Sequence, residues 1–443
     1  MKALILVLAL VVTLQHQIAT ATSYPVLYVR SDGLTDWPCG TSTVNPCKNI
    51  ATAVTKAHDY ATTTIKVAQG DYTEQIIIYD IDLPASRSGR LTIEGGWNAD
   101  FTVQSHDPAG TRLSPEGTQI IYVAPKLWHI VGLRLAYLTL QRTTDEQYHG
   151  LNASLDSGSL LDLAIEHCRV VSFEGSGIFL AAITDSDMTV TLHDNIIRDN
   201  YKGASPGAGV YVYADGGSTA EVTLTNNKIV ENYAANGGAV YLYTSGATLN
   251  ATLTNNILAD NQADQSGGAI YFAAGGTGTM NLSLTNNTVS NNLATYPAGG
   301  ILFSSSGSAQ IIAELTNTIV WGNNNSDIYI NQYDTSTTAV NSYYSMIGVV
   351  QNDGVTSSYH GYNNIHKNPV LNANYHLTGT SPAKNKGICG EIYWGGGYER
   401  YAPYDDIDGD ARPGWNAELG CDIGADEYRF PWILFNPVIT KQP

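Results

Sequence analysis

The chain has 443 residues, with 40 Asp and Glu against 22 Lys and Arg, and a formal net charge of −18. A nucleic-acid partner requires a basic surface, so this charge argues against one. It also disfavours an anionic polysaccharide unless metal ions bridge the like charges. The central part is the poorest in cations, because no Lys or Arg occurs between Lys228 and Lys367.

The N-terminus has the pattern of a secretory signal peptide. Met1 and Lys2 are followed by an apolar run over residues 3–14 and by the A-x-A cleavage pattern at residues 19–21. We therefore expect residues 1–21 to be a removable signal peptide. No later apolar run has the roughly 20 residues that a membrane-spanning helix needs. The pattern predicts an exported protein, secreted or at the cell surface, with no membrane-spanning segment.

The next segment predicts a cap for one end of the molecule. Residues 49–58 form a short amphipathic pattern, with Ile50, Val54 and Ala57 on one side, which predicts a helix. Residues 64–78 follow as strand, Gly turn and strand. A stack of repeats needs such a helix to cover its first open end.

Two phrases then recur in step with each other. A nine-residue phrase of the type L-T-N-N begins at Leu192, Leu224, Leu253, Leu284 and Leu315, in steps of 32, 29, 31 and 31 residues. The second phrase, of the type G-G-A-I-Y-F, alternates strictly, with Val240 and Leu242 facing one way and Tyr241 the other. Period two indicates β-strands with one buried face. Each unit of about 30 residues thus carries roughly three short strands, and successive units stack as an all-β parallel β-helix.

Asparagine recurs at fixed places in these units. It tolerates left-handed backbone geometry, and its amide can pair with the next amide in a stack. We therefore predict two asparagine ladders along the helix. One contains Asn195, Asn227, Asn256 and Asn287, and the other contains Asn200, Asn232, Asn261, Asn292 and Asn323.

Five cysteines in an exported chain suggest disulfides. Cys39 and Cys47 flank a short loop, and Cys389 and Cys421 bracket an Asp-rich C-terminal segment. We expect the pairs Cys39–Cys47 and Cys389–Cys421, although four cysteines permit three connectivities. Cys168 is then left over as a buried apolar position.

These phrases also resemble known families. The repeats resemble the right-handed parallel β-helix of the pectin-lyase-like superfamily, and the paired G-G-A-I and x-x-x-N phrases are similar to the repeats of polymorphic outer-membrane proteins. The I-A-T-A-V-T-K-A start at Ile50 and the D-I-D-G-D-A-R-P and D-I-G-A-D-E-Y phrases at Asp406 and Asp422 resemble bacterial β-helix proteins of the "choice-of-anchor Q" type. The resemblance implies a bacterial exported protein and implies no activity.

The same patterns divide the chain into five parts, the first of which is the signal peptide, residues 1–21. Residues 22–125 hold the N-terminal cap and the first coils, and residues 126–345 hold the central repeats. Residues 346–428 form the C-terminal coils and an Asp-rich segment that we expect to close the last coil. Residues 429–443 are a tail without a recognisable sorting motif, so the mode of anchoring stays open.

A column of carboxylates is the first candidate site. Asp199, Glu231 and Asp260 precede the second asparagine ladder in three consecutive units, and stacking would place them about 5 Å apart. That is the spacing of a retaining glycosidase pair, and Ca²⁺ could also bind there. The alternative is a row of solvated turn residues, since the column continues as Asn291 and Gly322.

A lyase is a further alternative for this region. In the superfamily that the repeats resemble, elimination from a uronate often uses Arg or Lys as the base, and the central units have neither. Arg169 and Arg198 remain on earlier units, close to Glu166 and Asp199, and we expect them to be paired surface charges.

An aromatic column is the second candidate site. It would stack on one outward face, where rings could bind sugars, and the alternative is cross-strand stabilisation worth roughly 0.2–1 kcal/mol per pair. Its members are Phe179, Tyr211, Tyr213, Tyr241, Tyr243 and Tyr271.

The Asp-rich segment is the third candidate site. Its carboxylates surround a Gly turn in a way that resembles a calcium loop, without EF-hand spacing. The residues concerned are Asp405, Asp406, Asp408 and Asp410. A structural role is the favoured interpretation, with structural calcium as an alternative and no required cofactor expected.

We therefore predict a non-catalytic exported β-helix that presents a repetitive surface for binding a polysaccharide or cell-surface glycan. The alternative is a polysaccharide-degrading enzyme, a glycoside hydrolase or less plausibly a lyase, that uses the carboxylate column.

Overall fold

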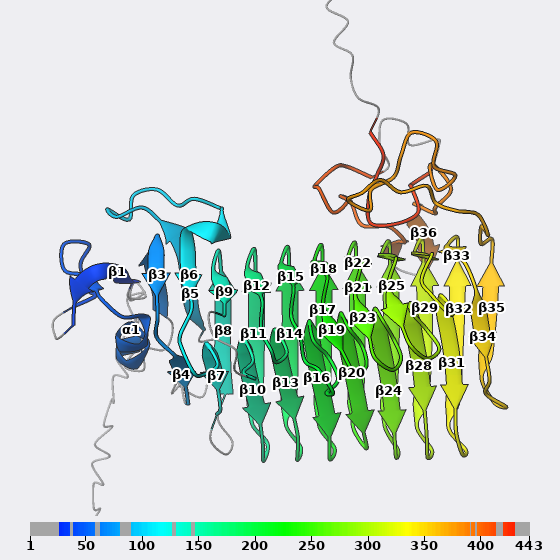
Figure 1. Ribbon diagram of the computed structural model, residues 1–443, viewed down its shortest axis with the longest axis horizontal. Helices are drawn as coiled ribbons and strands as arrows, with labels where there is room; N and C mark the ends of the chain where they lie inside the picture. Colours follow the sequence, from blue (N-terminus) through cyan, green and yellow to red (C-terminus); the bar gives the residue numbers. More distant parts are fainter. Residues whose placement is uncertain are drawn as a thin grey trace, which may run out of the picture.

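The computed structural model describes residues 26–35, 39–57, 63–79, 90–125, 130–142, 147–389, 391–394, 397–412 and 420–429. The expected signal peptide, residues 1–21, and all of the expected tail except Arg429 lie outside the described residues. Within them the chain forms a right-handed parallel β-helix whose coils stack along the long axis of the molecule (Figure 1). The fold class and the roughly three strands per coil expected from the repeats are confirmed.

Three parallel sheets run the length of the stack, and each full coil adds one strand to each of them. Sheet A has the longest strands: β1 (Val26–Leu34), β2 (Thr63–Ala68), β5 (Leu91–Trp97), β8 (Ile130–Ala136), β11 (Leu160–Glu166), β14 (Asp187–His193), β17 (Thr219–Thr225), β21 (Thr248–Thr254), β25 (Thr279–Thr285), β29 (Gln310–Thr316), β32 (Thr337–Tyr343) and β35 (Ser358–Tyr362).

Sheets B and C complete each coil. Sheet B contains β3 (Gly70–Tyr72), β6 (Thr111–Leu113), β9 (Thr139–Gln141), β12 (Arg169–Val171), β15 (Ile196–Arg198), β18 (Lys228–Val230), β22 (Ile257–Ala259), β26 (Thr288–Ser290), β30 (Ile319–Trp321) and β33 (Met346–Ile347). Sheet C contains β4 (Ile76–Ile78), β7 (Ile121–Val123), β10 (Leu151–Leu155), β13 (Ile178–Ala182), β16 (Val210–Asp215), β20 (Val240–Ser245), β24 (Ile270–Gly275), β28 (Ile301–Ser305), β31 (Ile328–Gln332) and β34 (Val350–Asn352).

Several smaller elements lie outside the three long sheets. Loops beside sheet C pair as a short three-stranded sheet of β19 (Tyr233–Ala234), β23 (Gln262–Ala263) and β27 (Leu293–Ala294). The remaining elements are the helix α1 (Ile50–Ala57), the 3-10 turn η1 (Pro108–Gly110) and the antiparallel pair β36 (Glu391–Trp394) and β37 (Gly397–Arg400). In the part of the chain that the structure describes, no helix is long and apolar enough to cross a membrane.

The strict register of the repeats explains the core. Leu224 pairs with Leu253 and Val240 with Ile270, so like residues stack on like and point inward, fully buried. Coils lie about 4.8 Å apart, the ordinary spacing of hydrogen-bonded strands. The core is therefore one continuous apolar column rather than a globular centre.

Both asparagine ladders are present at the corners of the coils. In the first, the side-chain amide of Asn227 donates to Asn256 Oδ1 at 3.0 Å, and Asn256 donates to Asn287 at the same distance. The members of the second ladder are linked at 2.8–3.0 Å from Asn200 to Asn323. Because these amides are buried, each bond satisfies a polar group that the fold has removed from water.

The N-terminal helix covers the first coils as expected. Ile50, Val54 and Ala57 of α1 are buried, and the Glu74 carboxylate accepts from the backbone N–H groups of Ile50 and Ala51 at 2.6 and 2.8 Å. The carboxylate thereby satisfies donors that every helix start leaves unpaired. The Cys39–Cys47 disulfide lies beside this cap, so the first predicted pairing is confirmed.

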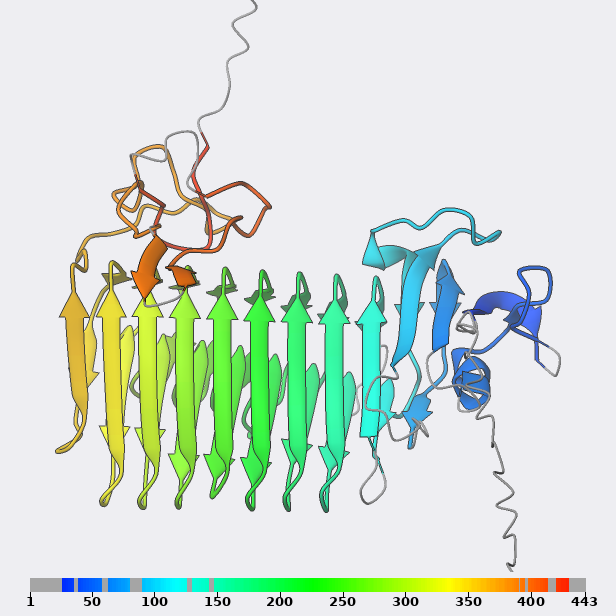
Figure 2. The same cartoon turned by 180° about the vertical axis from the view of Figure 1, so that it is seen from behind.

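The C-terminal segment, by which we mean the described residues between 366 and 429, differs from expectation. It does not close the last coil but turns back along the stack and lies over the corner between sheets A and B (Figures 1 and 2). The predicted Cys389–Cys421 disulfide is present within it, and Cys168 is buried and free.

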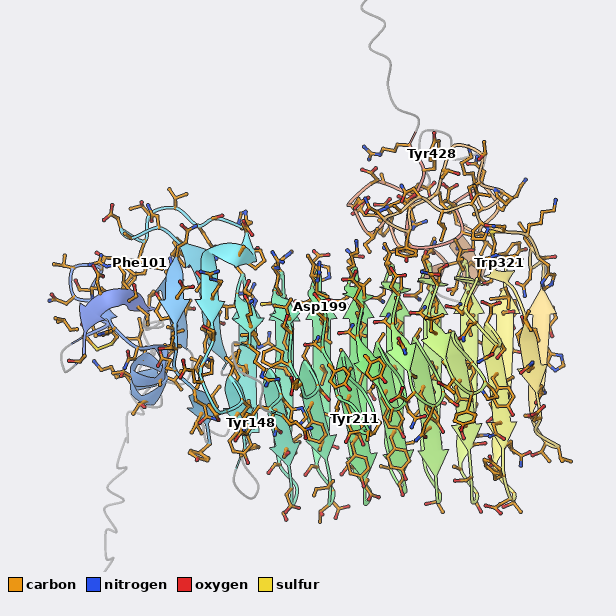
Figure 3. The ribbon with its side chains drawn as sticks, in the orientation of Figure 1. Phe101, Tyr148, Asp199, Tyr211, Trp321 and Tyr428 are labelled. Atoms are coloured by element: carbon orange, nitrogen blue, oxygen red, sulfur yellow. A yellow bond between two sulfur atoms is a disulfide. The ribbon has the colours of Figure 1, made fainter. Side chains whose placement is uncertain are left out.

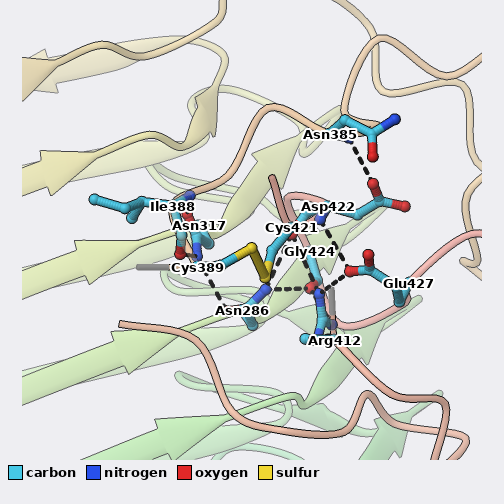
Figure 4. The surroundings of a disulfide bond; sticks show 10 residues. All are labelled: Asn286, Asn317, Asn385, Ile388, Cys389, Arg412, Cys421, Asp422, Gly424 and Glu427. Carbon is cyan, nitrogen blue, oxygen red and sulfur yellow. Dashed lines mark hydrogen bonds and ion pairs between the residues drawn. A yellow bond between two sulfur atoms is a disulfide. The ribbon is translucent and has the colours of Figure 1, made fainter. Parts of the chain in front are cut away.

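The first asparagine of each L-T-N-N phrase explains this docking. We call Asp194, Asn226, Asn255, Asn286 and Asn317 the corner column; all five have positive φ, between 50° and 57°. Asn255 donates to Asp405 O at 2.7 Å, and Asn286 donates to Gly424 O at 3.1 Å. Asn317 both donates to and accepts from the backbone of Ile388, at 2.8 Å each (Figure 4). The corner amides thus bind the irregular backbone of the C-terminal segment.

A buried ion pair holds the same segment together. Arg412 Nη1 lies 3.1 Å from Glu427 Oε2, with the arginine side chain fully buried, and Arg412 also donates to Gly424 O at 2.9 Å (Figure 4). The Glu427 carboxylate accepts from the Asp422 N–H at 2.9 Å. A charge removed from water requires this degree of pairing.

Candidate functional site

The three carboxylates of the first candidate site lie in consecutive coils. Asp199, Glu231 and Asp260 follow β15, β18 and β22 and share a positive φ of 55–58°. Each already has a partner. Arg198 bridges the first two, with Nε 2.6 Å from Asp199 and Nη2 3.2 Å from Glu231, while Asp260 accepts from the Tyr375 hydroxyl of the C-terminal segment.

This pairing bears on the hydrolase alternative. A retaining glycosidase needs one carboxylate as nucleophile and a second that holds a proton for the leaving group. Here a guanidinium lies between Asp199 and Glu231, and their side chains are 41% and 49% exposed. The arrangement is that of partly exposed surface ion pairs, and the catalytic role of the column stays a prediction.

The second candidate site, which we call the aromatic face, lies on the outward side of sheet C (Figure 3). Its members are Phe179, Tyr211, Tyr213, Tyr241, Tyr243 and Tyr271. Neighbours along the main row meet edge to face, with ring centroids 5.2, 5.1 and 5.1 Å apart. The second row is a parallel stack of Tyr213 on Tyr243 at 5.4 Å.

Glycine turns partly cover the main row. Gly207 and Gly237 have φ of 69° and 61°, and a Cβ on either would lie 2.7 Å from Tyr211 Cβ or 2.9 Å from Tyr241 Cβ. The turn before each strand therefore packs directly on the outward ring, which only glycine permits. The rings are half-buried as a result, and burial raises the pKa of Tyr211.

One cation, which the repeat pattern does not predict, lies at the end of this row. Lys202 Nζ lies 4.7 Å from the ring centroid of Tyr211 and 5.2 Å from that of Phe179, and it donates to Ser176 Oγ at 2.9 Å. Burial lowers the pKa of Lys202 to about 8. Burial, with Lys202 as a second cause, also lowers the pKa of His149, which stacks on Phe179, to about 4.

The Asp-rich segment does not bring its carboxylates to one point. Asp406 accepts from the backbone N–H groups of Asp408, Asp410 and Glu427 at 2.7–2.9 Å. Asp408 lies 3.0 Å from His376 Nε2, and Asp410 lies 2.7 Å from Arg429 Nε. These separate partners do not fit a shared calcium site at Asp405, Asp406, Asp408 and Asp410, and calcium binding there stays a prediction.

A hollow of about 360 Å³ lies on sheet B, between η1 and β15. Arg112, Arg169, Arg198 and Asp199 are in its wall. We expected Arg169 and Arg198 to be paired surface charges, and this was correct for Arg198 alone. Glu166 pairs with Arg134 at 2.7 Å instead, so Arg169 has no ion pair among the described residues and its Nε atom is buried without a partner.

A second hollow of about 550 Å³ lies between the stack and the C-terminal segment. The corner residues Asp194 and Asn226 line one side, and His376 and Asp408 line the other. This hollow could not be predicted from the sequence, because its walls come from segments about 180 residues apart. Its only local signal was the departure of His193 and Asp194 from the T-N pair that the later phrases have.

Comparison with known proteins agrees with the fold. Residues 158–258 match the protein-family model described as "Right handed beta helix region". The matched stretch begins just before β11 and ends within β22, inside the repeats described above. A search of curated proteins finds no match to the chain.

Proposed function

We propose that this protein is an exported, non-catalytic β-helix that binds a neutral glycan through the aromatic face. One observation carries the proposal: half-buried, outward-facing rings repeat in register along sheet C, with neighbouring centroids 5.1–5.4 Å apart. Two disulfides support export, because such bonds persist in oxidising compartments. A rigid face of this kind suits presentation to another cell.

The spacing of the rings matches the chemistry of a sugar chain. Tyrosine offers an apolar ring with a polar end, which suits ligands that have apolar faces and hydroxyl edges. The coil repeat of about 4.8 Å is close to the length of one pyranose unit. A glycan lying along the helix axis would therefore meet one ring in each coil.

Charge limits the choice of glycan. The chain carries a formal charge of −18, so a polyanion would be repelled over most of the surface. Lys202 is the cation in contact with the rings of the aromatic face, and with a pKa of about 8 it offers one positive charge near neutral pH. A neutral polysaccharide fits this surface best.

A glycan array with paired variants tests the proposal. Tyr213→Ala with Tyr243→Ala removes the parallel stack from the aromatic face. The matched control is Tyr343→Ala with Tyr362→Ala, which removes a similar stack, 5.1 Å apart, from sheet A. We expect retention to fall at least about tenfold for the first pair and to persist for the second. Unchanged retention in the first pair, or equal loss in both, would overturn the proposal.

The hydrolase alternative is tested in the same assay. Asp199→Asn and Glu231→Gln keep the shape of the carboxylate column and remove its charge. If the wild-type chain degrades an array glycan and these variants do not, while their folding is intact, the protein is an enzyme. The aromatic face would then be at most a substrate-binding surface.

A further inference from the structure

Three side chains with metal-binding atoms gather at the corner between sheets A and B. His193 ends β14 and Asp194 begins the turn that follows, while His167 occupies the matching turn position one coil earlier. Parallel stacking therefore places all three side by side. Asp194 Oδ2 lies 3.1 Å from His193 Nε2 and 3.4 Å from His167 Nδ1, and the three ligand atoms lie within 4.8 Å of one another.

The two distances from Asp194 fit a tetrahedral metal ion, and the two histidine nitrogens lie within 4.8 Å of each other. An ion about 2.0–2.1 Å from each ligand atom holds neighbouring ligand atoms roughly 3.3–3.4 Å apart. The two Asp194 distances of 3.1 and 3.4 Å are close to that value. Two imidazoles and one carboxylate are a ligand set that suits Zn²⁺, and three protein ligands leave one coordination position open.

The surroundings orient the three side chains. The ring of Tyr137 stacks on His167 at 4.9 Å, parallel to it, and Asn226 occupies the position that matches Asp194 one coil later. The nearby Glu166 is held by Arg134 at 2.7 Å, which keeps its carboxylate occupied. Such outer contacts fix the direction of metal ligands in known sites.

One member of the cluster, Asp194, lies in the wall of the larger hollow. Asp194 and Asn226 line that space of about 550 Å³, and the Oδ1 atom of Asn226 is buried with no hydrogen-bond partner among the described residues. An ion at the cluster, with its bound water, would give this corner the polar neighbours that it lacks. The hollow is also large enough to admit a small ligand to the open coordination position.

We propose that His167, His193 and Asp194 bind one Zn²⁺ ion, with its fourth position open to the hollow beneath the C-terminal segment. The site lies on a different face from the aromatic rows and does not depend on glycan binding. The neighbouring cluster of His376, Asp408 and Asp426 is less suited, because Asp426 is buried and accepts from the Leu377 N–H at 2.7 Å.

Zinc titration of the metal-stripped full-length chain tests the proposal. We expect one equivalent of Zn²⁺ to bind the wild type and to raise its Tm. Combining His167→Ala with His193→Ala should weaken binding roughly 100-fold or more, because two of the three ligands are lost. The controls are His360→Ala, an exposed histidine on β35, and His376→Ala in the neighbouring cluster. Both controls should bind as the wild type does.

Three outcomes would overturn the proposal: no binding by the wild type, unchanged binding by the double variant, or loss of binding on His376→Ala alone. The Co²⁺ spectrum of the wild type gives a second measurement that needs no substitution. Intense visible absorption, as four-coordinate Co²⁺ produces, supports the site. A weak spectrum like that of hydrated Co²⁺ contradicts it, even if the double variant does not fold.

Discussion

Lys202 shows how single residues depart from the repeat. The later coils have no cation at this place, whereas here an ammonium lies 4.7 Å from the ring centroid of Tyr211 and donates to Ser176. The faces of the neighbouring aromatic rings favour the charged form of Lys202. Burial disfavours it and is the stronger effect, because the pKa is lowered to about 8. The residue therefore carries a charge that the fold only partly compensates.

The pH dependence of stability should reveal this burial. The pKa of Lys202 is about 8 in the folded chain against an ordinary 10.5, so the unfolded chain binds more protons between those values and stability rises with pH there. Lys202→Met keeps the packing of the stem and removes the titration. We expect the unfolding free energy of the wild type, relative to the variant, to rise by about 1–3 kcal/mol between pH 8 and 10.5 and to be flat below pH 8. Urea unfolding at several pH values measures this, and a flat difference across the window would contradict it.

At the scale of the repeated element, the two asparagines of L-T-N-N have different tasks. The second builds the ladder inside the corner, and the first reaches outward to the C-terminal segment. Asn256 shows the ladder role: its Oδ1 accepts from both the backbone and the side chain of Asn227, and its amide donates to Leu224 O at 2.8 Å. One side chain therefore satisfies several buried polar groups at once.

For this reason, we expect Asn256→Ala to destabilise the folded protein. It leaves the Asn227 N–H and the Leu224 carbonyl buried without partners, which we expect to lower the unfolding free energy by about 2–4 kcal/mol. Asn256→Thr is the matched control, because Thr318 naturally takes the ladder position in the fifth phrase and donates to Leu284 O at 3.1 Å. Asn256→Thr should lower the unfolding free energy by about half as much, because it leaves fewer buried groups without a partner. Equal costs in denaturant unfolding would show that the ladder bonds contribute little.

The irregular C-terminal segment depends on its buried ion pair instead. Arg412→Met would leave Glu427 buried without the arginine that pairs with its charge, an effect of about 3–5 kcal/mol. Combining Arg412→Met with Glu427→Leu removes both charges and should recover much of that stability. Limited proteolysis of the segment measures the difference. If the double variant is cleaved as readily as the single one, the charge left without its arginine is not the cause.

The repeats made the three-sheet stack predictable from the sequence. Sites that depend on segments without repeats could not be predicted in this way. Strand alternation and fixed steps define which residues point inward, so the core, the ladders and the outward tyrosines follow from period alone. The C-terminal segment has no period, and its contact between Asn255 and Asp405 joins residues 150 positions apart. The hollow between the stack and the C-terminal segment depends on such contacts, whereas Arg169 lacks an ion pair among the described residues because Glu166 pairs with Arg134. His193 and Asp194 were visible only as a departure from the repeat.

For the whole molecule, the C-terminal segment changes how stability is distributed. In a repeat stack each coil contacts its neighbours, so coupling along the axis is local. Here one segment binds several coils at once through Asn255, Asn286 and Asn317, and the Ala425 N–H donates to Thr288 at 3.0 Å. The coils beneath it are therefore joined laterally as well as along the axis, while the earlier coils are not.

For this reason, we expect loss of the Cys389–Cys421 disulfide to destabilise only the coils that lie beneath the C-terminal segment. The bond closes a loop with a sequence separation of 32 residues, and such a loop contributes about 3–4 kcal/mol through the unfolded chain. In the variant with both cysteines replaced by Ser, we expect faster hydrogen exchange at Gly387 and Gly424, whose amides donate to Cys421 O and Asn317 O at 2.7 Å.

Exchange in the coils up to β11 should not change, because none of the described hydrogen bonds of the C-terminal segment reaches them. The matched control replaces Cys39 and Cys47 by Ser and should speed exchange near α1 and the first coils alone. Faster exchange spread evenly along the stack in either variant would show that the molecule opens as a single unit. Local opening in both would show instead that its two ends are stabilised independently, with the central repeats transmitting little between them.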